Sequence, residues 1–383
     1  MLFFLYAIII VVFLDTFIQL PIISPYAQQL GASAFLTGMI VAVYSLTNMI
    51  GNAFCGHLID RYGRKKLLLV GMGLVTIILL LYPAVSSGWG LFLIRFIHGL
   101  AGGALIPAAF AYLGDLSPEK GRGKRMAFSG ASIGIAAIIG PAIGGIISAR
   151  YTIDIVFYLV AFLFFAAFIG VMLGLKETVP LKEQKEKVDI RDLFLLLRNP
   201  TMFQAINGAF ALMFSMGILA HALPLKVQSL YLSSAITGML LSSFGIVALI
   251  IFLTPINNIF DKFIPQRFIL GGLSLISFAL LCLTVVNSLP LMVAVMIVYG
   301  IGFSFVFPSM NRIVVDISSE ADRGKAFGIF YASFSLGVVF GSLLSGATST
   351  SVSTPFFIGG IVMMFLSISF WALLQWSSHL KMT

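Results

Sequence analysis

Apolar residues fill most of the chain in long runs that short polar segments interrupt. A run of about 20 apolar residues is long enough to cross a bilayer as an α-helix. Such a segment is predicted to be helical because lipid offers its backbone hydrogen-bonding groups no partners. The sequence therefore predicts an all-α integral membrane protein with 12 transmembrane helices. Their expected ranges are 2–24, 33–56, 66–84, 89–113, 124–148, 154–175, 201–224, 233–255, 267–286, 290–313, 325–348 and 354–376.

Composition and charge agree with a membrane protein. Of the 383 residues 60% are hydrophobic and only 10% are charged, too few to cover the surface of soluble domains. All Lys and Arg residues except Arg95, Arg150 and Lys226 fall in or beside loops on one side of the predicted membrane. The positive-inside rule places that side and both termini in the cytoplasm, and we expect a plasma-membrane location. This topology explains the net charge of +9, and we expect no nucleic-acid partner.

The two halves of the chain match each other at a constant offset of 201 residues. The matching pairs include Asp60 and Asp261, Gly99 and Gly300, Pro107 and Pro308, Asp115 and Asp316, and the two RGK segments at 122–124 and 323–325. Six predicted spans in each half give a parallel repeat, a plan that suits rocking of one half against the other about a central site. The expected parts are an N-terminal six-helix bundle, a cytoplasmic linker and a C-terminal six-helix bundle, at 1–175, 176–200 and 201–383.

Four short segments resemble motifs of the major facilitator superfamily. GHLIDRYGRKK at 56–66 is similar to motif A of that family, with the matching residues Gly56, Asp60, Arg61, Gly63, Arg64 and Lys65. RFIHG at 95–99 resembles motif B, and GIAAIIGPAIGG at 134–145 resembles motif C of proton-coupled antiporters. LDTFIQLP at 14–21 is similar to the first-helix motif of drug exporters. Along its whole length, the chain resembles the 12-helix drug:proton antiporter group.

The resemblance to motif A implies a conformational latch at the cytoplasmic ends of the helices. Asp60 would accept hydrogen bonds at the N-terminus of the eleventh span, near Gly324, where the helix dipole favours an anion. Arg64 would pair with Asp115 at the end of the fourth span. These contacts are expected to form in the outward-open state and to break in the inward-open state. The alternative is that the charges only set the topology.

The segment that resembles motif C predicts a close helix contact. Small residues let helices approach closely in lipid, and a proline removes one backbone hydrogen bond and bends the span. We expect this strip to lie against a neighbouring helix such as the eighth span, and the resemblance implies antiport. The residues concerned are Gly134, Gly140, Pro141, Gly144 and Gly145.

Two ionisable residues lie deep within predicted spans, the acid Asp15 and the base Arg95. Charged groups inside a membrane are costly and mark candidate functional sites. Burial favours the neutral form of a carboxyl group, and a nearby cation favours its ionised form. A carboxyl group that alternates between two such environments would bind and release a proton, so Asp15 is predicted to be the proton carrier. An Asp15–Arg95 ion pair, or a bond from Asp15 to backbone, that only holds helices together is the alternative. His98 follows Arg95 by three positions, lies on a similar helix face and is a candidate proton relay.

The expected substrate cavity lies between the halves and is lined by the first, fourth, seventh and tenth spans. These spans are poor in polar side chains, and Gln19, Asn207, Tyr299 and Phe303 are the further lining candidates. A pocket rich in Phe and Met with one acid suits amphipathic or cationic organic molecules. The sequence thus predicts a proton-coupled efflux transporter. A facilitator for another solute class, such as a sugar or a lipid-linked compound, and a membrane receptor without transport remain alternatives.

The sequence offers little support for catalysis. It has no Walker loop and no His-rich metal cluster, so we expect no enzyme activity, no metal and no cofactor. The expected partners are a small-molecule substrate, protons and the lipid bilayer, and the protein is predicted to be a monomer. His221 and Lys226 lie near the outer end of the seventh span, and we expect them at the membrane interface.

Overall fold

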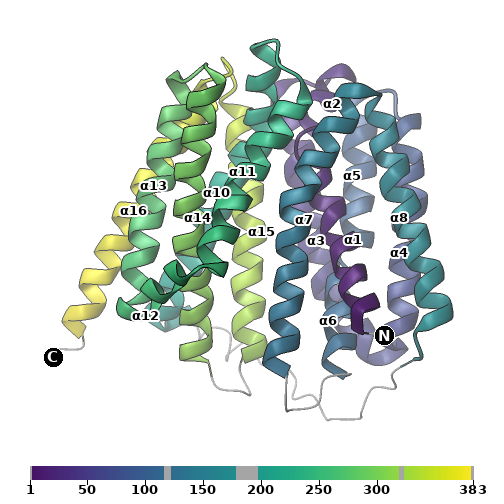
Figure 1. The fold of residues 1–383 in the computed structure, drawn as a ribbon, viewed down its shortest axis with the longest axis horizontal. Coiled ribbons are helices and arrows are strands. Elements are labelled where there is room, and N and C mark those ends of the chain that lie inside the picture. The colour runs from purple at the N-terminus through teal and green to yellow at the C-terminus, as the bar shows by residue number, and fades with distance from the viewer. Residues whose placement is uncertain (1, 116–121, 178–196, 319–322, 381–383) are drawn as a thin grey trace. The chain divides into compact units, whose positions relative to one another are not determined.

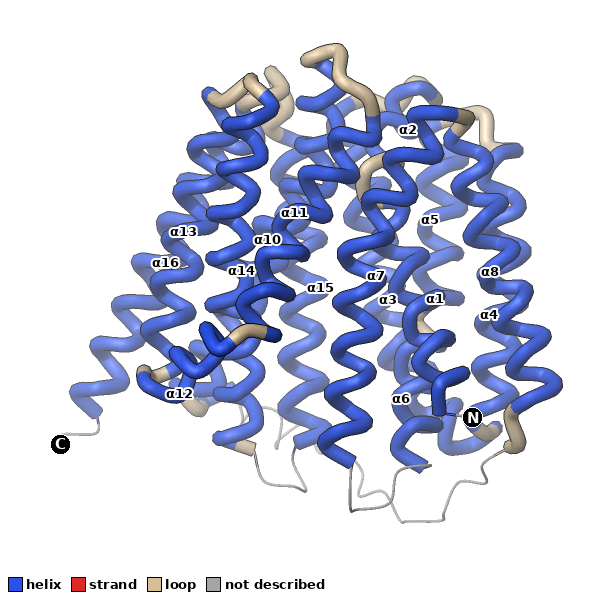
Figure 2. The backbone as a smooth tube through the Cα atoms, viewed as in Figure 1, coloured by secondary structure: helices blue, strands red, loops and turns tan. Residues whose placement is uncertain are grey.

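The computed structural model describes residues 2–115, 122–177, 197–318 and 323–380, and within these ranges the chain is helical (Figures 1 and 2). Twelve helical stretches are long and apolar enough to cross a membrane, which confirms the predicted fold class. The helices of the first half are α1 Leu2–Gln19, α2 Ile23–Gln29, α3 Ala34–Tyr62, α4 Arg64–Leu81, α5 Gly88–Gly102, α6 Leu105–Asp115, α7 Arg122–Arg150 and α8 Ile153–Gly174. Those of the second half are α10 Pro200–Ser229, α11 Ser234–Leu253, α12 Ile259–Lys262, α13 Pro265–Val285, α14 Leu289–Ile317, α15 Arg323–Ala347 and α16 Thr354–Leu380. Short 3₁₀ turns, η1 and η2, occupy Tyr82–Ala84 and Pro255–Asn258.

The helices gather into two compact units. Unit 1 comprises Met1–Gln184 and Val227–Ser242, and unit 2 comprises Lys185–Lys226 and Ser243–Thr383. Within unit 1, the long helices α1, α3, α4, α5, α7 and α8 run alongside one another (Figure 1). Within unit 2, α13 packs against both α14 and α16. The start of α11 therefore groups with the helices of the first half, and most of the predicted linker lies outside the described residues.

Two predicted spans are interrupted. In the first, α1 ends at Gln19 and α2 begins at Ile23, with Pro21, which lacks a backbone N–H, in the turn between them. In the fourth, Gly103 and Ala104 form a turn between α5 and α6. A β-carbon at Gly103 would lie 2.6 Å from the Asn48 carbonyl oxygen of α3, so glycine is required for this close approach.

Helix α7 packs through its small residues against two helices. A β-carbon at Gly140 would lie 2.8 Å from the Phe17 Cβ of α1, and one at Gly144 would collide with the Ile18 carbonyl oxygen. On another side of α7, Gly145 and Pro141 lie against the start of α11, the eighth span. The helices α1 and α11 thus approach α7 at backbone distance, which small residues permit. Gly134 differs, since a β-carbon there would meet no atom within 4 Å.

His221 and Lys226 are buried in unit 2, and their location at the membrane interface stays a prediction. Their exposed fractions are 0% and 1%. His221 Nδ1 lies 2.8 Å from the Ser345 hydroxyl. Lys226 Nζ donates to the Leu283 carbonyl in the last turn of α13 and lies 5.7 Å from the Phe356 ring centroid. The carbonyl groups at a helix C-terminus favour a cation, so a buried ammonium is accommodated there.

The Gly144→Ala substitution is expected to destabilise the protein by about 1–3 kcal/mol, because the new methyl group would force α1 away from α7 at Ile18. Thermal unfolding of the detergent-purified variant would measure the loss. Gly134→Ala is the matched control, and it should leave the unfolding midpoint unchanged or raise it, since the added methyl group meets open space. Equal midpoints for the two variants would contradict the close α1–α7 contact.

Candidate functional site

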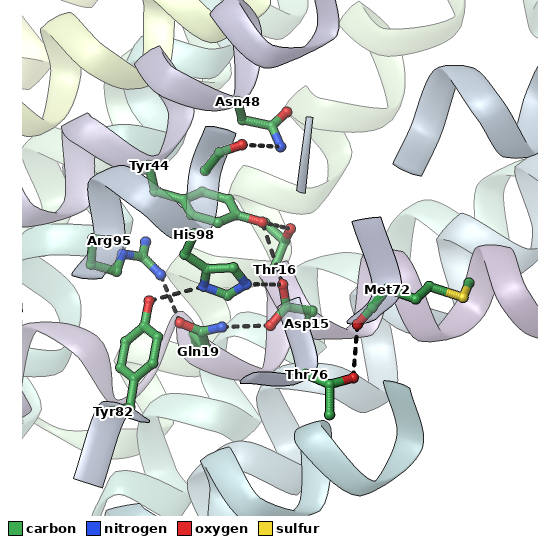
Figure 3. Close-up of polar contacts among 11 residues, drawn as sticks. Asp15, Thr16, Gln19, Tyr44, Asn48, Met72, Thr76, Tyr82, Arg95 and His98 are labelled. Carbon is green, nitrogen blue, oxygen red and sulfur yellow. Dashed lines mark hydrogen bonds and ion pairs between the residues drawn. The ribbon is translucent and has the colours of Figure 1, made fainter. Parts of the chain in front are cut away.

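A buried cluster of polar side chains in unit 1 surrounds Asp15 of α1, which is 2% exposed. Its Oδ1 accepts a hydrogen bond of 2.6 Å from Gln19 Nε2, one helical turn later. Its Oδ2 lies 3.1 Å from His98 Nε2 of α5 and 3.4 Å from the Tyr44 hydroxyl of α3, which donates to it (Figure 3). The carboxyl group is therefore partnered on both oxygens within an apolar interior.

Arg95 lies on the same face of α5 as His98, but it reaches Asp15 only through Gln19. Its Nη1 donates to Gln19 Oε1 at 2.6 Å, and the side-chain amide of Gln19 therefore stands between the two charges (Figure 3). The guanidinium also lies 4.4 Å from the Tyr44 ring centroid, and its Nε donates to the Ile40 carbonyl at 3.4 Å. In the described part of the chain, Asp15 and Arg95 form no direct ion pair.

His98 joins the carboxyl group to a second partner. The ring is fully buried, and its Nδ1 lies 2.9 Å from the Tyr82 hydroxyl of η1. A hydroxyl group can either donate or accept, so Tyr82 can serve both the neutral and the protonated imidazole. His98 therefore links the Asp15 carboxyl group of α1 to the Tyr82 hydroxyl of η1.

Local sequence explains how these side chains meet. Asp15 and Gln19 are four residues apart and Arg95 and His98 are three apart, spacings that place each pair on one helix face. Gly99, in the segment that resembles motif B, brings α5 close to α3, because a β-carbon there would lie 2.5 Å from the Tyr44 carbonyl oxygen.

Sequence reasoning missed Tyr44 and Tyr82 as members of the cluster. Both lie on elements other than α1 and α5, and no spacing rule links them to Asp15. The span that contains Tyr44 also carries other hydroxyl and amide side chains, so its hydroxyl group was not conspicuous. Tyr82 is fixed from behind by a stack on Phe157, with centroids 4.3 Å apart, and by Tyr26, whose hydroxyl donates to the Tyr82 carbonyl at 2.9 Å.

The other pocket candidates are distributed over unit 2. Tyr299 is fully buried and its hydroxyl lies 2.8 Å from that of Ser215. Phe303, one turn further along α14, is half-buried, and both rings pack against Phe244 with centroids 5.5 Å apart. Asn207 lies half-buried on α10, and its side-chain oxygen has no hydrogen-bond partner among the described residues. Gln19 belongs to the Asp15 cluster described above.

The segment that resembles motif A forms a glycine turn with an ion pair beside it. Gly63 adopts a φ of +96°, a conformation that glycine accommodates and other residues rarely do. Arg64 Nε lies 2.9 Å from Asp115 Oδ2, at the end of α6. Glu177 accepts hydrogen bonds of 3.0 and 3.1 Å from the backbone N–H groups of Lys65 and Lys66, at the N-terminus of α4, where an anion is favoured. The surroundings of the remaining latch candidates lie outside the described part of the structure: Gly56, Asp60, Arg61 and Gly324.

The described residues form neither the nucleophile turn of a hydrolase nor a metal-binding group. Residues 130–134, GASIG, match the G-x-S-x-G spacing of hydrolases, but they lie within α7 rather than on a strand-to-helix turn. The Ser132 hydroxyl donates to the Phe128 carbonyl at 2.9 Å, as in an ordinary helix. Among the described residues, no group of three or more His, Cys, Asp or Glu side chains lies close enough together to hold a metal ion.

Comparison with known proteins identifies the family. The model of the Major Facilitator Superfamily matches residues 5–226 and again residues 205–381. The chain belongs to the major facilitator superfamily. It is a multi-pass membrane protein and a secondary transporter of small molecules, and the members of this family are not enzymes.

Curated relatives of this superfamily member are distant but extend over most of the chain. The multidrug resistance protein MdtG of Yersinia enterocolitica is 26% identical over 371 residues, which are 92% of this chain and 88% of MdtG. Multidrug resistance protein 2 of Bacillus subtilis is 24% identical over 93% of this chain and 90% of its own length. An uncharacterised MFS-type transporter of Methanocaldococcus jannaschii is 26% identical, with 85% of both chains covered.

Solved structures share the fold. A bacterial homologue of the human lysosomal transporter Spinster, in an inward-facing and occupied conformation, has a TM-score of 0.81 at 13% identity and covers 98% of this chain and 96% of its own. The human organic anion transporter MFSD10 has a TM-score of 0.71 at 16% identity, with 96% and 98% covered. At such low identity, these structures establish the architecture alone.

The Arg64–Asp115 ion pair should appear as non-additivity in a double-mutant cycle. Arg64→Gln and Asp115→Asn are each expected to lower the thermal unfolding midpoint, and the double variant should be little worse than either one. The coupling should be about 0.2–1 kcal/mol and should weaken with added salt, because both side chains retain some contact with solvent. Strictly additive effects at low salt would show that the pair contributes no interaction energy.

Proposed function

We propose that this transporter exports amphipathic or cationic small organic molecules in exchange for protons. It would work by rocking alternating access in the plasma membrane, as a monomer with both termini in the cytoplasm. The observation that carries the proposal is the buried Asp15 carboxyl group, which is joined to His98 on one oxygen and to Gln19 and Arg95 through the other. Ionisable groups inside a membrane span are costly and mark candidate functional sites.

The energetics favour a proton-coupled function for the cluster. In the proposed cycle, the cluster would bind a proton on Asp15 or His98 on one side of the membrane and release it on the other. A change of access from one side of the membrane to the other would expose the cluster to a different pH. One proton crossing a potential of 100 mV supplies about 2.3 kcal/mol, and a pH gradient adds to this.

The substrate class rests on the relatives and on the aromatic side chains of unit 2. Two of the relatives are named multidrug resistance proteins. On α14, Phe303 and Phe307 stack in parallel with centroids 5.6 Å apart, and Phe307 meets Phe334 of α15 at 6.3 Å. Half-exposed rings such as these suit apolar and cationic aromatic molecules, whereas sugars would need many more hydrogen-bonding groups.

The turn at Gly63 and the Arg64–Asp115 pair are proposed to belong to a conformational latch. Each such contact is worth about 1 kcal/mol or less at a partly exposed site. Several together would shift a two-state equilibrium by about tenfold, since 1.4 kcal/mol corresponds to that factor. The latch would therefore bias the conformations without locking either of them.

Asp15→Asn tests the function directly. In proteoliposomes with an imposed pH gradient, uphill transport of an amphipathic cation such as tetraphenylphosphonium should fall to the level of empty liposomes. The reason is that an amide of the same shape cannot bind and release the proton. Exchange of labelled for unlabelled cation at equal pH needs no net proton movement and should continue.

The control for this experiment is Asp154→Asn, which removes a carboxyl group in the first turn of α8 that forms no hydrogen bond or ion pair with the described side chains of the cluster. It should transport like the unmodified protein. Normal uphill transport by the Asp15→Asn variant would refute proton coupling through Asp15.

A further inference from the structure

We propose that Gln19 is a positioning residue whose side-chain amide keeps Arg95 from pairing directly with Asp15, so that the Asp15 carboxyl remains able to exchange a proton. This inference rests on the proposed proton coupling and adds a specific role for Gln19. The sequence had suggested a substrate-lining role for this residue. In the structure, its side-chain amide forms hydrogen bonds with both Asp15 and Arg95.

Both polar atoms of the Gln19 side-chain amide form hydrogen bonds. Its Nε2 donates to Asp15 Oδ1 and its Oε1 accepts from Arg95 Nη1, and each distance is 2.6 Å. These two partners fix the amide orientation, because a carboxylate only accepts and a guanidinium only donates. A carboxylate at position 19 could not donate to Asp15, and an apolar side chain could partner neither charge. Gln19 is 2% exposed, so water does not compete freely for either contact.

Arg95 is held near Asp15 by groups that leave its charge intact. The Tyr44 ring face and the Ile40 carbonyl orient the guanidinium, and neither one neutralises it. One amide group separates the guanidinium from the carboxyl group, so rotation of both side chains would bring the two ions together if that amide were absent. A direct, bidentate Arg–carboxylate pair is among the strongest contacts that a buried acid can make.

The groups that face Asp15 come from few elements. α3 supplies Tyr44, α5 supplies Arg95 and His98, and Tyr82 of η1 reaches the carboxyl group through His98. The helix α7, which packs against α1, has no titratable side chain between residues 128 and 149. The neighbouring helices α6 and α8 carry theirs near their ends, at Tyr112, Asp115, Asp154 and Tyr158. Arg95 is thus the permanent cation of the cluster, and Gln19 lies between it and Asp15.

Infrared spectroscopy of the purified protein tests this role without a substrate. The carbonyl stretch of a protonated, buried carboxyl group is recorded as pH is varied, and the band that Asp15→Asn removes is assigned to Asp15. In Gln19→Ala, Arg95 can close onto Asp15, so the midpoint of this band should move to lower pH by about 1–3 units. Gln19→Asn, whose amide is too short to join both partners, should move the midpoint in the same direction and guards against misfolding of the Ala variant.

Two further variants complete the test. In Gln19→Ala/Arg95→Gln the cation is gone, and the midpoint should return upward past that of Gln19→Ala. Gln28→Ala, the same change at an exposed position of α2, should leave the midpoint unmoved. An unchanged or raised midpoint in both Gln19 variants would overturn the positioning role. If uphill transport survives in Asp15→Asn, the proposed function fails instead, whatever the midpoints show.

Discussion

The site depends on one constraint, which is that a carboxylate enclosed by apolar helices must find partners for both of its oxygens inside the protein. Asp15 meets this constraint with Gln19 on one oxygen and with His98 and Tyr44 on the other. The side chains of Arg95 and His98 must in turn have hydrogen-bonding partners of their own. The cluster therefore extends over α1, α3, α5 and η1. A single buried acid thus determines how four elements of unit 1 are arranged.

Glycines make this arrangement sterically possible. Gly144 lets α7 press against α1 at Ile18, one residue before Gln19, and Gly99 lets α5 reach the α3 backbone at Tyr44. The segments that resemble motifs B and C therefore supply the close helix contacts that fix the position of Asp15 on α1. In lipid there is little hydrophobic gain from helix association, so close backbone contact and hydrogen bonds carry much of the specificity.

The sequence predicted the number and type of elements well, because hydropathy over about 20 residues follows directly from the thickness of the bilayer. It also identified Asp15 and Arg95, since charges in apolar runs are conspicuous. It did not anticipate that Gln19 would separate them, because contacts between side chains of different helices depend on packing distances that no spacing rule supplies. The burial of Lys226 was not anticipated for a related reason, because the carbonyl group that accepts from its ammonium group, that of Leu283, lies on another helix.

The interruption of the fourth span divides it mechanically. Arg95 and His98 lie on α5, whereas Asp115 is the last residue of α6. The turn at Gly103 and Ala104 separates these two segments, so they do not form one continuous helix. The neighbouring helix α3 runs without a break from Ala34 to Tyr62 and carries Tyr44 in its first half. In the proposed transport cycle, a movement at the Asp15 cluster would therefore reach the Gly63 turn through the unbroken α3 helix rather than through α5 and α6.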